Sequence, residues 1–169
     1  MYHILAANYQ AIGKGKVVEI FHNWGDVFNI EFNIKVTKKP ARGRWANVFH
    51  FTASGFNHGR YGDRIPAFWI HGNGFFHICS AISGNVNYCK NFNYVQGKLY
   101  QVAIKQQLEA FGKYWYEIVI NGVSILKVEN KKVERFSRVK LYASDPWHDP
   151  FSKKLGSISH IQILQKGLL

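Results

Sequence analysis

The stretch from Leu99 to Asn130 most constrains how this chain can fold. Apolar and polar residues alternate over 100–105 and again over 114–120, which is the pattern of strands with one buried face. Asn121-Gly122 follows, and this pair favours a two-residue hairpin turn because both residues tolerate a positive φ. The run 123–128 then returns alongside. Three paired strands with one apolar face need a second layer to cover them.

The rest of the chain supplies that second layer. Turn residues recur at short spacing throughout the 169 residues, which is typical of an all-β domain. Apolar residues make up 47% of the chain, enough for a core. We therefore predict one domain over 1–169, folded as a two-sheet antiparallel β-sandwich of the jelly-roll type. The segment 105–111 is the one place where a short helix is an alternative.

The chain is strongly basic, with a formal net charge of +12. This charge favours anionic partners: sulfated glycans, acidic glycoproteins, membrane surfaces or nucleic acid. The basic residues gather over 38–44 and 131–140, and these clusters would form a heparin-like site if the fold brought them together. A solvated basic surface without a specific ligand is the alternative. No RRM, KH or zinc pattern is present, so we predict no specific nucleic-acid partner.

The two cysteines indicate a disulfide. Cys79 and Cys89 flank Ser83-Gly84-Asn85, a plausible hairpin loop that would place them opposite each other at disulfide distance. Two buried free thiols are the alternative. A disulfide favours a secreted protein. The first residues lack the pattern of a signal peptide, so a mature secreted domain and a cytosolic protein both stay open. No apolar run is long enough to span a bilayer.

The order of features resembles the concanavalin A-like superfamily of jelly rolls, which includes laminin G-like domains, pentraxins and galectins. The resemblance covers 17–164 and is carried by KLYQVAI, KYWYEIVINGVSILKVEN, RVKLYAS and LGSISHIQI, preceded by IEFNIKV, ANVFHFTAS and PAFWIHGNGFFHI. It implies glycan or protein recognition, and in some members glycan hydrolysis or Ca²⁺ binding. The galectin run His-x-Asn-x-Arg begins here at His50 but does not continue at that spacing. The Glu-x-Asp-x-x-Glu strand of the hydrolase members is absent.

The polar loop 54–64 is the first candidate site. A sugar is recognised by planar polar groups on its hydroxyls and an aromatic face on its ring, and this loop with the strands beside it offers both. The ligand-binding candidates here are His50, Asn57, His58, Arg60, Tyr61, Asp63, Arg64 and Trp69. The alternative is a structural loop, closed by a contact of Asp63 with Arg60 or Arg64, with Trp69 in the core.

The loop 144–154 is the second candidate site. Asp145 and Asp149 are spaced so that, with main-chain carbonyls, they could hold Ca²⁺. Trp147 and His148 lie between them and are further ligand-binding candidates. The alternative is a structural loop, because Asp-Pro pairs start turns and Ca²⁺ takes about 6–8 oxygen ligands.

These patterns favour a non-catalytic, lectin-like recognition module that binds a glycan or an acidic glycoconjugate. The alternative is a structural or protein-interaction domain of an extracellular matrix or adhesion protein, and homo-oligomerisation stays open. Catalysis is disfavoured, since no HExxH or GxSxG motif is present. A glycoside hydrolase would need a suitably spaced carboxyl pair in a cleft.

Overall fold

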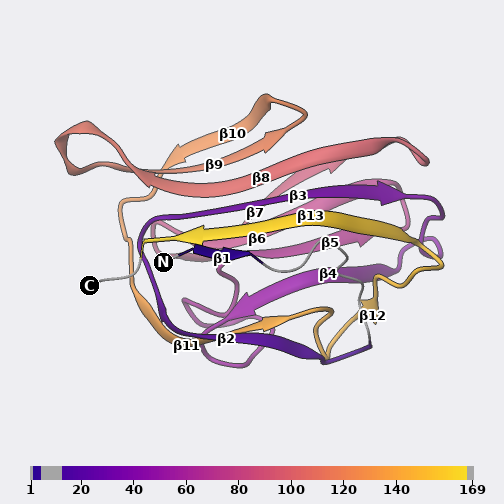
Figure 1. Ribbon diagram of the computed structural model, residues 1–169, viewed down its shortest axis with the longest axis horizontal. Helices are drawn as coiled ribbons and strands as arrows, with labels where there is room; N and C mark the ends of the chain where they lie inside the picture. Colours follow the sequence, from indigo (N-terminus) through magenta and orange to yellow (C-terminus); the bar gives the residue numbers. More distant parts are fainter. Residues whose placement is uncertain (1, 5–12, 167–169) are drawn as a thin grey trace.

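Strands fill most of the chain in the computed structural model, which describes residues 2–4 and 13–166. Two sheets stack face to face (Figure 1), so the predicted all-β, two-sheet antiparallel sandwich is confirmed. The elements are β1 Tyr2–Ile4, β2 Val17–Trp24, β3 Phe28–Val36, β4 Trp45–Thr52, β5 Ala67–His71, β6 Phe75–Ile82, β7 Asn85–Asn93, β8 Leu99–Leu108, η1 Ala110–Gly112, β9 Tyr114–Ile120, β10 Val123–Glu129, β11 Phe136–Tyr142, β12 Asp149–Pro150 and β13 Gly156–Gln165.

The strand order mixes distant parts of the chain. One sheet runs β1-β13-β3-β8-β9-β10, and the other runs β2-β11-β4-β5-β6-β7. The short strand β12 pairs with β4 and is the one parallel contact among the described strands. Within the described residues, no helix is long and apolar enough to cross a membrane. The apolar run 4–9 also predicts a first edge strand over 2–11; β1 covers its first part, and residues 5–11 lie outside the described residues.

The core lies between the sheets and is rich in aromatic rings. On β3 every second residue is buried, from Phe28 to Val36. Phe32 meets Phe49 and Phe68 of the other sheet edge to face, each at a centroid distance of 5.3 Å. Such aromatic pairs add about 0.5–1.5 kcal/mol each beyond the burial of their area. The alternation read from the sequence therefore identifies the face that holds the sheets together.

The predicted hairpins form, with one difference in detail. Asn121 and Gly122 make the β9–β10 turn with φ of 50° and 77°. In the β6–β7 hairpin the turn is Ser83-Gly84, shorter than the predicted three residues, and an irregularity between Ser80 and Ile82 restores the register. The segment 105–111 is no helix: β8 continues to Leu108, and only the short turn η1 follows.

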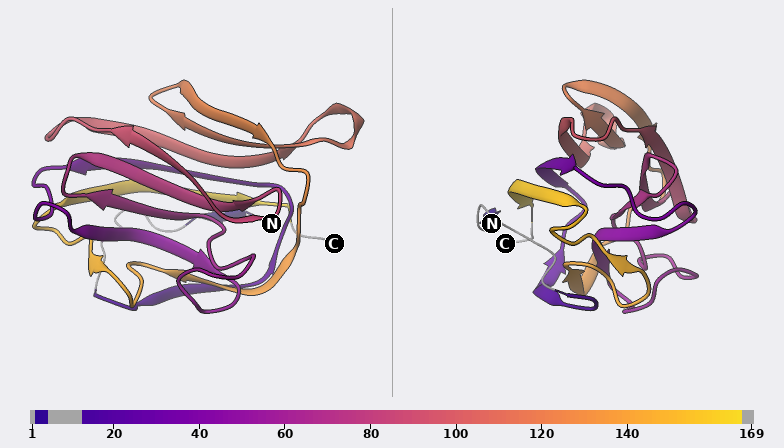
Figure 2. Two further views of the ribbon diagram at one scale, coloured as in Figure 1. Left: turned by 180° about the vertical axis from the view of Figure 1, so that it is seen from behind. Right: turned by 90° about the vertical axis from the view of Figure 1, so that its right-hand side faces the viewer.

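The sandwich has two ends with different loops (Figures 1 and 2). The connections 53–66 and 130–135 and the β8–β9 turn lie at one end, together with the start of β3. The connection 37–44 lies at the other end, close to the β5–β6 turn and to 94–98. The candidate site described next lies on the outside of the sheet that contains β4 to β7.

Candidate functional site

The outer face of β4 to β7 carries three rows of side chains, each with one residue from every strand. The cross-strand partners are Trp45–His71–Phe75–Asn93, Asn47–Trp69–His77–Asn91 and His50–Ala67–Cys79–Cys89. The rings contact one another, since the Trp45 centroid lies 4.3 Å from that of His71 and 4.9 Å from that of His77. The outside of an antiparallel sheet is usually solvated and polar, so this aromatic face needs a cover or a ligand.

Trp69 at the centre of this face is covered by two loops. It is only 1% exposed, although it points away from the space between the sheets. The Arg64 guanidinium lies 4.5 Å from the Trp69 ring centroid, and Trp69 Nε1 lies 3.2 Å from His148 Nδ1. The sequence alternative that placed Trp69 in a core is therefore right about its burial, but the core is a second, smaller one outside the sheet.

Asp145 organises the loop 144–150 that forms this cover. Its buried carboxylate accepts hydrogen bonds from the backbone N–H groups of Trp147 (3.1 Å) and His148 (2.9 Å). His148 Nδ1 lies 2.8 Å and His50 Nδ1 3.1 Å from Oδ2. Burial alone would raise the pKa of the Asp145 carboxyl, but the hydrogen bonds and charge of the two histidines outweigh it and lower that pKa.

His50 connects the two loops beneath the cover. Its Nε2 lies 2.7 Å from the Asp63 carbonyl oxygen, and its Nδ1 faces the Asp145 carboxylate. A neutral imidazole carries one proton, so both contacts are hydrogen bonds only when the ring is charged. Burial lowers the pKa of His50, and the Asp145 hydrogen bond opposes that shift. Protonation of the His50 ring is thus coupled to how both loops pack over the sheet.

Asp63 closes the loop 53–64, as one of the sequence alternatives held. Its Oδ2 accepts the backbone N–H of Arg60 at 2.8 Å, and its Oδ1 accepts the hydroxyl of Ser54. The closure uses the main chain of Arg60 and leaves the Arg60 guanidinium 4.9 Å from the Phe56 ring centroid. The carboxylate is therefore part of the loop's framework.

Arg64 ties this loop to the edge strand β7. Its guanidinium donates to the carbonyl (3.0 Å) and side-chain oxygen (2.9 Å) of Asn57, and to Asn87 Oδ1 (2.5 Å). Burial lowers the pKa of Arg64 to about 10, against the opposing charges of Asp145 and Asp63. Since every contact lies within the fold, Arg64 covers Trp69 and is not offered to a ligand.

The open part of the face lies beside Trp45, where a hollow of about 200 Å³ separates it from the loop 144–150. The hollow is lined by Lys14, Gly43, Arg44, Trp45, Trp147, His148 and Asp149. Arg44 pairs with Asp149 at 3.0 Å, with both side chains at least half exposed. On the far side of Trp45, the His77 ring bonds the exposed Asn91 amide at 2.6 Å. Aromatic rings, cations and amides thus border one surface.

The structure brings together some of the predicted site residues and separates others. His50, Asp63, Arg64, Trp69, Asp145, Trp147 and His148 form the covered cluster, and Asn57 joins it through Arg64. His58 and Arg60 are exposed on the loop. Tyr61 points elsewhere, because its hydroxyl donates to the Lys132 carbonyl oxygen at 2.5 Å and its ring lies near Phe136. Of the predicted set, Trp147, His148 and Asp149 border the hollow.

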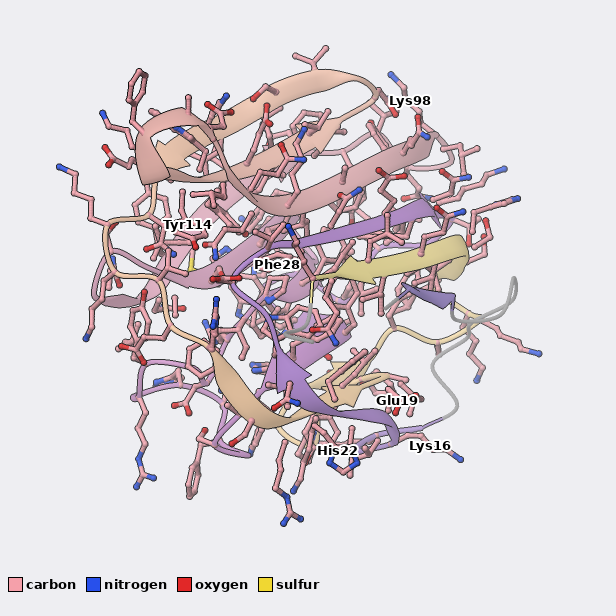
Figure 3. All side chains as sticks on the ribbon, turned by 60° about the vertical axis from the view of Figure 1, so that its left-hand side comes forward. Lys16, Glu19, His22, Phe28, Lys98 and Tyr114 are labelled. Carbon is pink, nitrogen blue, oxygen red and sulfur yellow. A yellow bond between two sulfur atoms is a disulfide. The ribbon has the colours of Figure 1, made fainter. Side chains whose placement is uncertain are left out.

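The predicted calcium ligands do not share a site. The Asp145 carboxylate is fully buried and occupied by N–H groups, whereas Asp149 faces Arg44 on the surface. Among the described residues, the arrangement that could hold a metal ion is His77 with Cys79 and Cys89. These two sulfurs form the predicted disulfide (Figure 3), so they offer no thiolate. The structure gives no support to the calcium site expected from the loop 144–154.

Sequence reasoning missed Lys14, Trp45, His77 and Asn91, and it placed Arg44 only in the basic cluster 38–44. A signal existed for two of them: Asn91 alternates with Cys89 and His77 with Cys79, so the disulfide marks which face they share. Lys14 and Arg44 reach the hollow from separate connections, which no spacing reveals. The two basic clusters lie at opposite ends of the sandwich (Figure 1), so they do not form the combined site considered above.

Comparisons with known proteins find structural likeness alone. No family model matches the chain, and no curated protein matches it. The receptor-binding domain of botulinum neurotoxin D is similar with a TM-score of 0.60 and 14% identity, over 98% of this chain and 42% of that one. The binding domain of botulinum neurotoxin DC in complex with SialylT has a TM-score of 0.53 and 18% identity, over 85% and 33%.

A third solved structure belongs to botulinum neurotoxin type C, whose cell entry is described as dependent on two ganglioside molecules. Its TM-score is 0.52 at 16% identity, over 85% of this chain and 33% of that one. At these identities the comparisons show a shared fold. This chain spans only about a third to two fifths of the length of those domains.

Proposed function

We propose that this chain is a non-catalytic recognition module for acidic glycans, with its binding site at the hollow beside Trp45. We further propose that it is a secreted member of the concanavalin A-like superfamily. The disulfide supports secretion, since such bonds persist in oxidising compartments. The similarity to toxin domains that are described with gangliosides and SialylT supports a glycan ligand.

The observation that carries the proposal is the composition of the hollow. Two cations, Lys14 and Arg44, lie beside the Trp45 ring and the Asp149 carboxylate. An indole ring packs against the C–H face of a sugar, a guanidinium forks onto a carboxylate or sulfate, and a carboxylate accepts from hydroxyls. Ligand pockets for larger molecules span about 300–1,000 Å³. The hollow of about 200 Å³ suits one acidic sugar unit.

A glycan array tests this proposal, run at low and at physiological salt with sialylated, sulfated and neutral glycans. We expect saturable binding to acidic glycans that a free sugar competes. Arg44→Ala should weaken it about tenfold or more, because a hydrogen bond to a charged group contributes about 1.5–3 kcal/mol. Lys35→Ala is the matched control, since it removes an exposed cation from the other sheet.

Two outcomes would contradict the proposal. Binding to every polyanion that disappears at physiological salt indicates net charge alone. Absence of any sugar-competed binding favours the alternative, a structural or protein-interaction domain whose partner is a protein.

A further inference from the structure

The turn between β8 and β9 carries a fully exposed aromatic ring. Phe111 is 98% exposed, and Leu108 at the end of β8 is 51% exposed. The turn extends beyond the neighbouring strands at its end of the sandwich (Figures 1 and 2). One exposed apolar residue is ordinary on a protein surface, so exposure by itself decides nothing. Two further observations on the same turn indicate that the exposed ring has a role.

The first observation is the backbone conformation at Phe111. Its φ of 65° lies in the left-handed region, and Gly112 follows with φ of 73°. Bulky residues are unfavourable there, whereas Gly, Asn and Asp adopt this conformation readily. The turn is closed by the Glu109 N–H, which donates to the Lys113 carbonyl oxygen at 2.8 Å. Local structure thus favours a small polar residue at 111, and the chain has a phenylalanine that points into solvent.

The second is the charge at the base of the turn. The Asn130 N–H donates to the Tyr114 carbonyl oxygen at 2.8 Å, so the basic connection 130–135 begins beside the turn. The Tyr114 hydroxyl and the Arg135 guanidinium both bond Asp26 Oδ2. Figure 3 brings this end forward and labels Tyr114. The connection between β10 and β11 is therefore held against the base of the turn.

Three acidic groups near this turn are paired with cations, and Glu129 at the end of β10 forms no ion pair within the described part of the chain. Glu109 pairs with Lys127 at 2.9 Å, Glu134 with Lys132 at 3.3 Å, and Asp26 with Arg135 at 2.8 Å. Lys113 and Lys131 are exposed and form no ion pair within the described part of the chain. Two lysines without an ion pair, against one such carboxylate, leave the surroundings of the projecting ring with a net positive charge.

We propose that the β8–β9 turn is a membrane anchor, in which Phe111 enters an anionic phospholipid bilayer while Lys113 and Lys131 meet its head groups. A bilayer has an apolar interior beneath a negative surface, which matches a projecting ring with cations at its base. A soluble polyanion would engage the cations but offer the ring no apolar environment. The hollow beside Trp45 lies toward the other end, where Arg44 directly precedes β4, so both sites can be occupied together.

Vesicle flotation at physiological salt tests the anchor. The probes are vesicles of phosphatidylcholine with about one third phosphatidylserine, and vesicles of phosphatidylcholine alone. We expect binding to the charged vesicles, weakened about tenfold or more by Phe111→Asn, which removes the ring that enters the bilayer but suits the left-handed turn. Phe111→Leu should retain most of the binding. Lys113→Ala should weaken it about fivefold.

The matched control is Val95→Asn, because Val95 is 64% exposed in the turn at the opposite end. It should bind charged vesicles like the unaltered protein. Equal binding by the Phe111→Asn variant, or equal binding of the unaltered protein to both kinds of vesicle, would overturn the proposal. Binding to soluble heparin without vesicle binding would also contradict it. The vesicles contain no glycan, so Arg44→Ala keeps vesicle binding, and the two proposals fail separately.

Discussion

Asp145→Asn is expected to be the most damaging conservative change in the covered cluster. The carboxylate is fully buried and holds Trp147, His148 and His50. An asparagine keeps one oxygen for the backbone N–H groups, but its amide N–H₂ replaces the second oxygen and the charge. A hydrogen bond to a charged group contributes about 1.5–3 kcal/mol, and a buried polar group left without a partner costs about 1–3 kcal/mol. Because the backbone bonds survive, we expect a loss of about 3 kcal/mol.

The assay is thermal and urea unfolding at pH 7. For a chain of this size, 1 kcal/mol shifts the melting temperature by about 2–4 °C, so the variant should melt about 6–12 °C lower. Asp149→Asn is the control, because Asp149 forms a surface pair with Arg44 at 3.0 Å. Such pairs contribute about 0–1 kcal/mol, so this control should melt within about 4 °C of the unaltered protein.

The pH dependence supplies a second readout. Folding lowers the pKa of Asp145, so its contribution to stability is complete above about pH 4 and is lost as the pH falls further. Folding also lowers the pKa of His50, so a separate loss begins as the pH falls below about 6.5. The Asp145→Asn variant should lack the loss of stability that begins below about pH 4. The reasoning would be refuted if the variant lost less than about 1 kcal/mol of unfolding free energy at pH 7 and still lost stability below about pH 4 as the unaltered protein does.

Three further changes test other parts of the structure. Arg64→Lys cannot reproduce the fork onto Asn57 and Asn87, so it should cost about 2 kcal/mol in urea unfolding and shift the fluorescence of Trp69; an unchanged spectrum would contradict the cover over that ring. The double variant Cys79→Ala with Cys89→Ala should lose about 2–3 kcal/mol by calorimetry, because the disulfide closes a loop of sequence separation 10; equal stability would show that the unfolded chain is not constrained by it. Gly72→Ala places a Cβ 2.0 Å from the Ala41 carbonyl oxygen, so it should lower the free energy of unfolding by more than about 2 kcal/mol; a neutral result would mean that the connection 37–44 moves freely.

Much of the fold could be predicted from the sequence because its signals are local. The alternation in 114–120 places Tyr116 and Ile118 in the core, where they are at most 1% exposed. Asn121-Gly122 forms the turn that follows and sets the register of β10 as far as Ser124, after which the register shifts before Leu126. Cys79 and Cys89 pair as predicted, although the hairpin reaches that register through a shorter turn and an irregularity at 80–82. Periodicity does not reveal such compensation.

The site was only partly predictable because its groups come from distant segments. The loop 54–64 holds polar residues as expected, but Arg64, held in place by Asn57, covers Trp69 and is not open to a ligand. The hollow instead joins Lys14, Arg44 and His148, from connections more than 100 residues apart at the extremes. No spacing rule connects these three residues. Arg44, which directly precedes β4, lies near Lys14 and His148 only once the sheets have formed.

The sequence by itself determined the strands, their inward faces, the hairpin turns and the disulfide, because each depends on residues close together in the chain. Only the tertiary structure decided that Asp145 would be buried against β4 and that two loops would cover part of the outer face of β4 to β7. The physical reason is that burial and charge pairing depend on neighbours in space. A carboxylate is a calcium ligand when it faces water with other oxygens, and a framework group when N–H donors surround it.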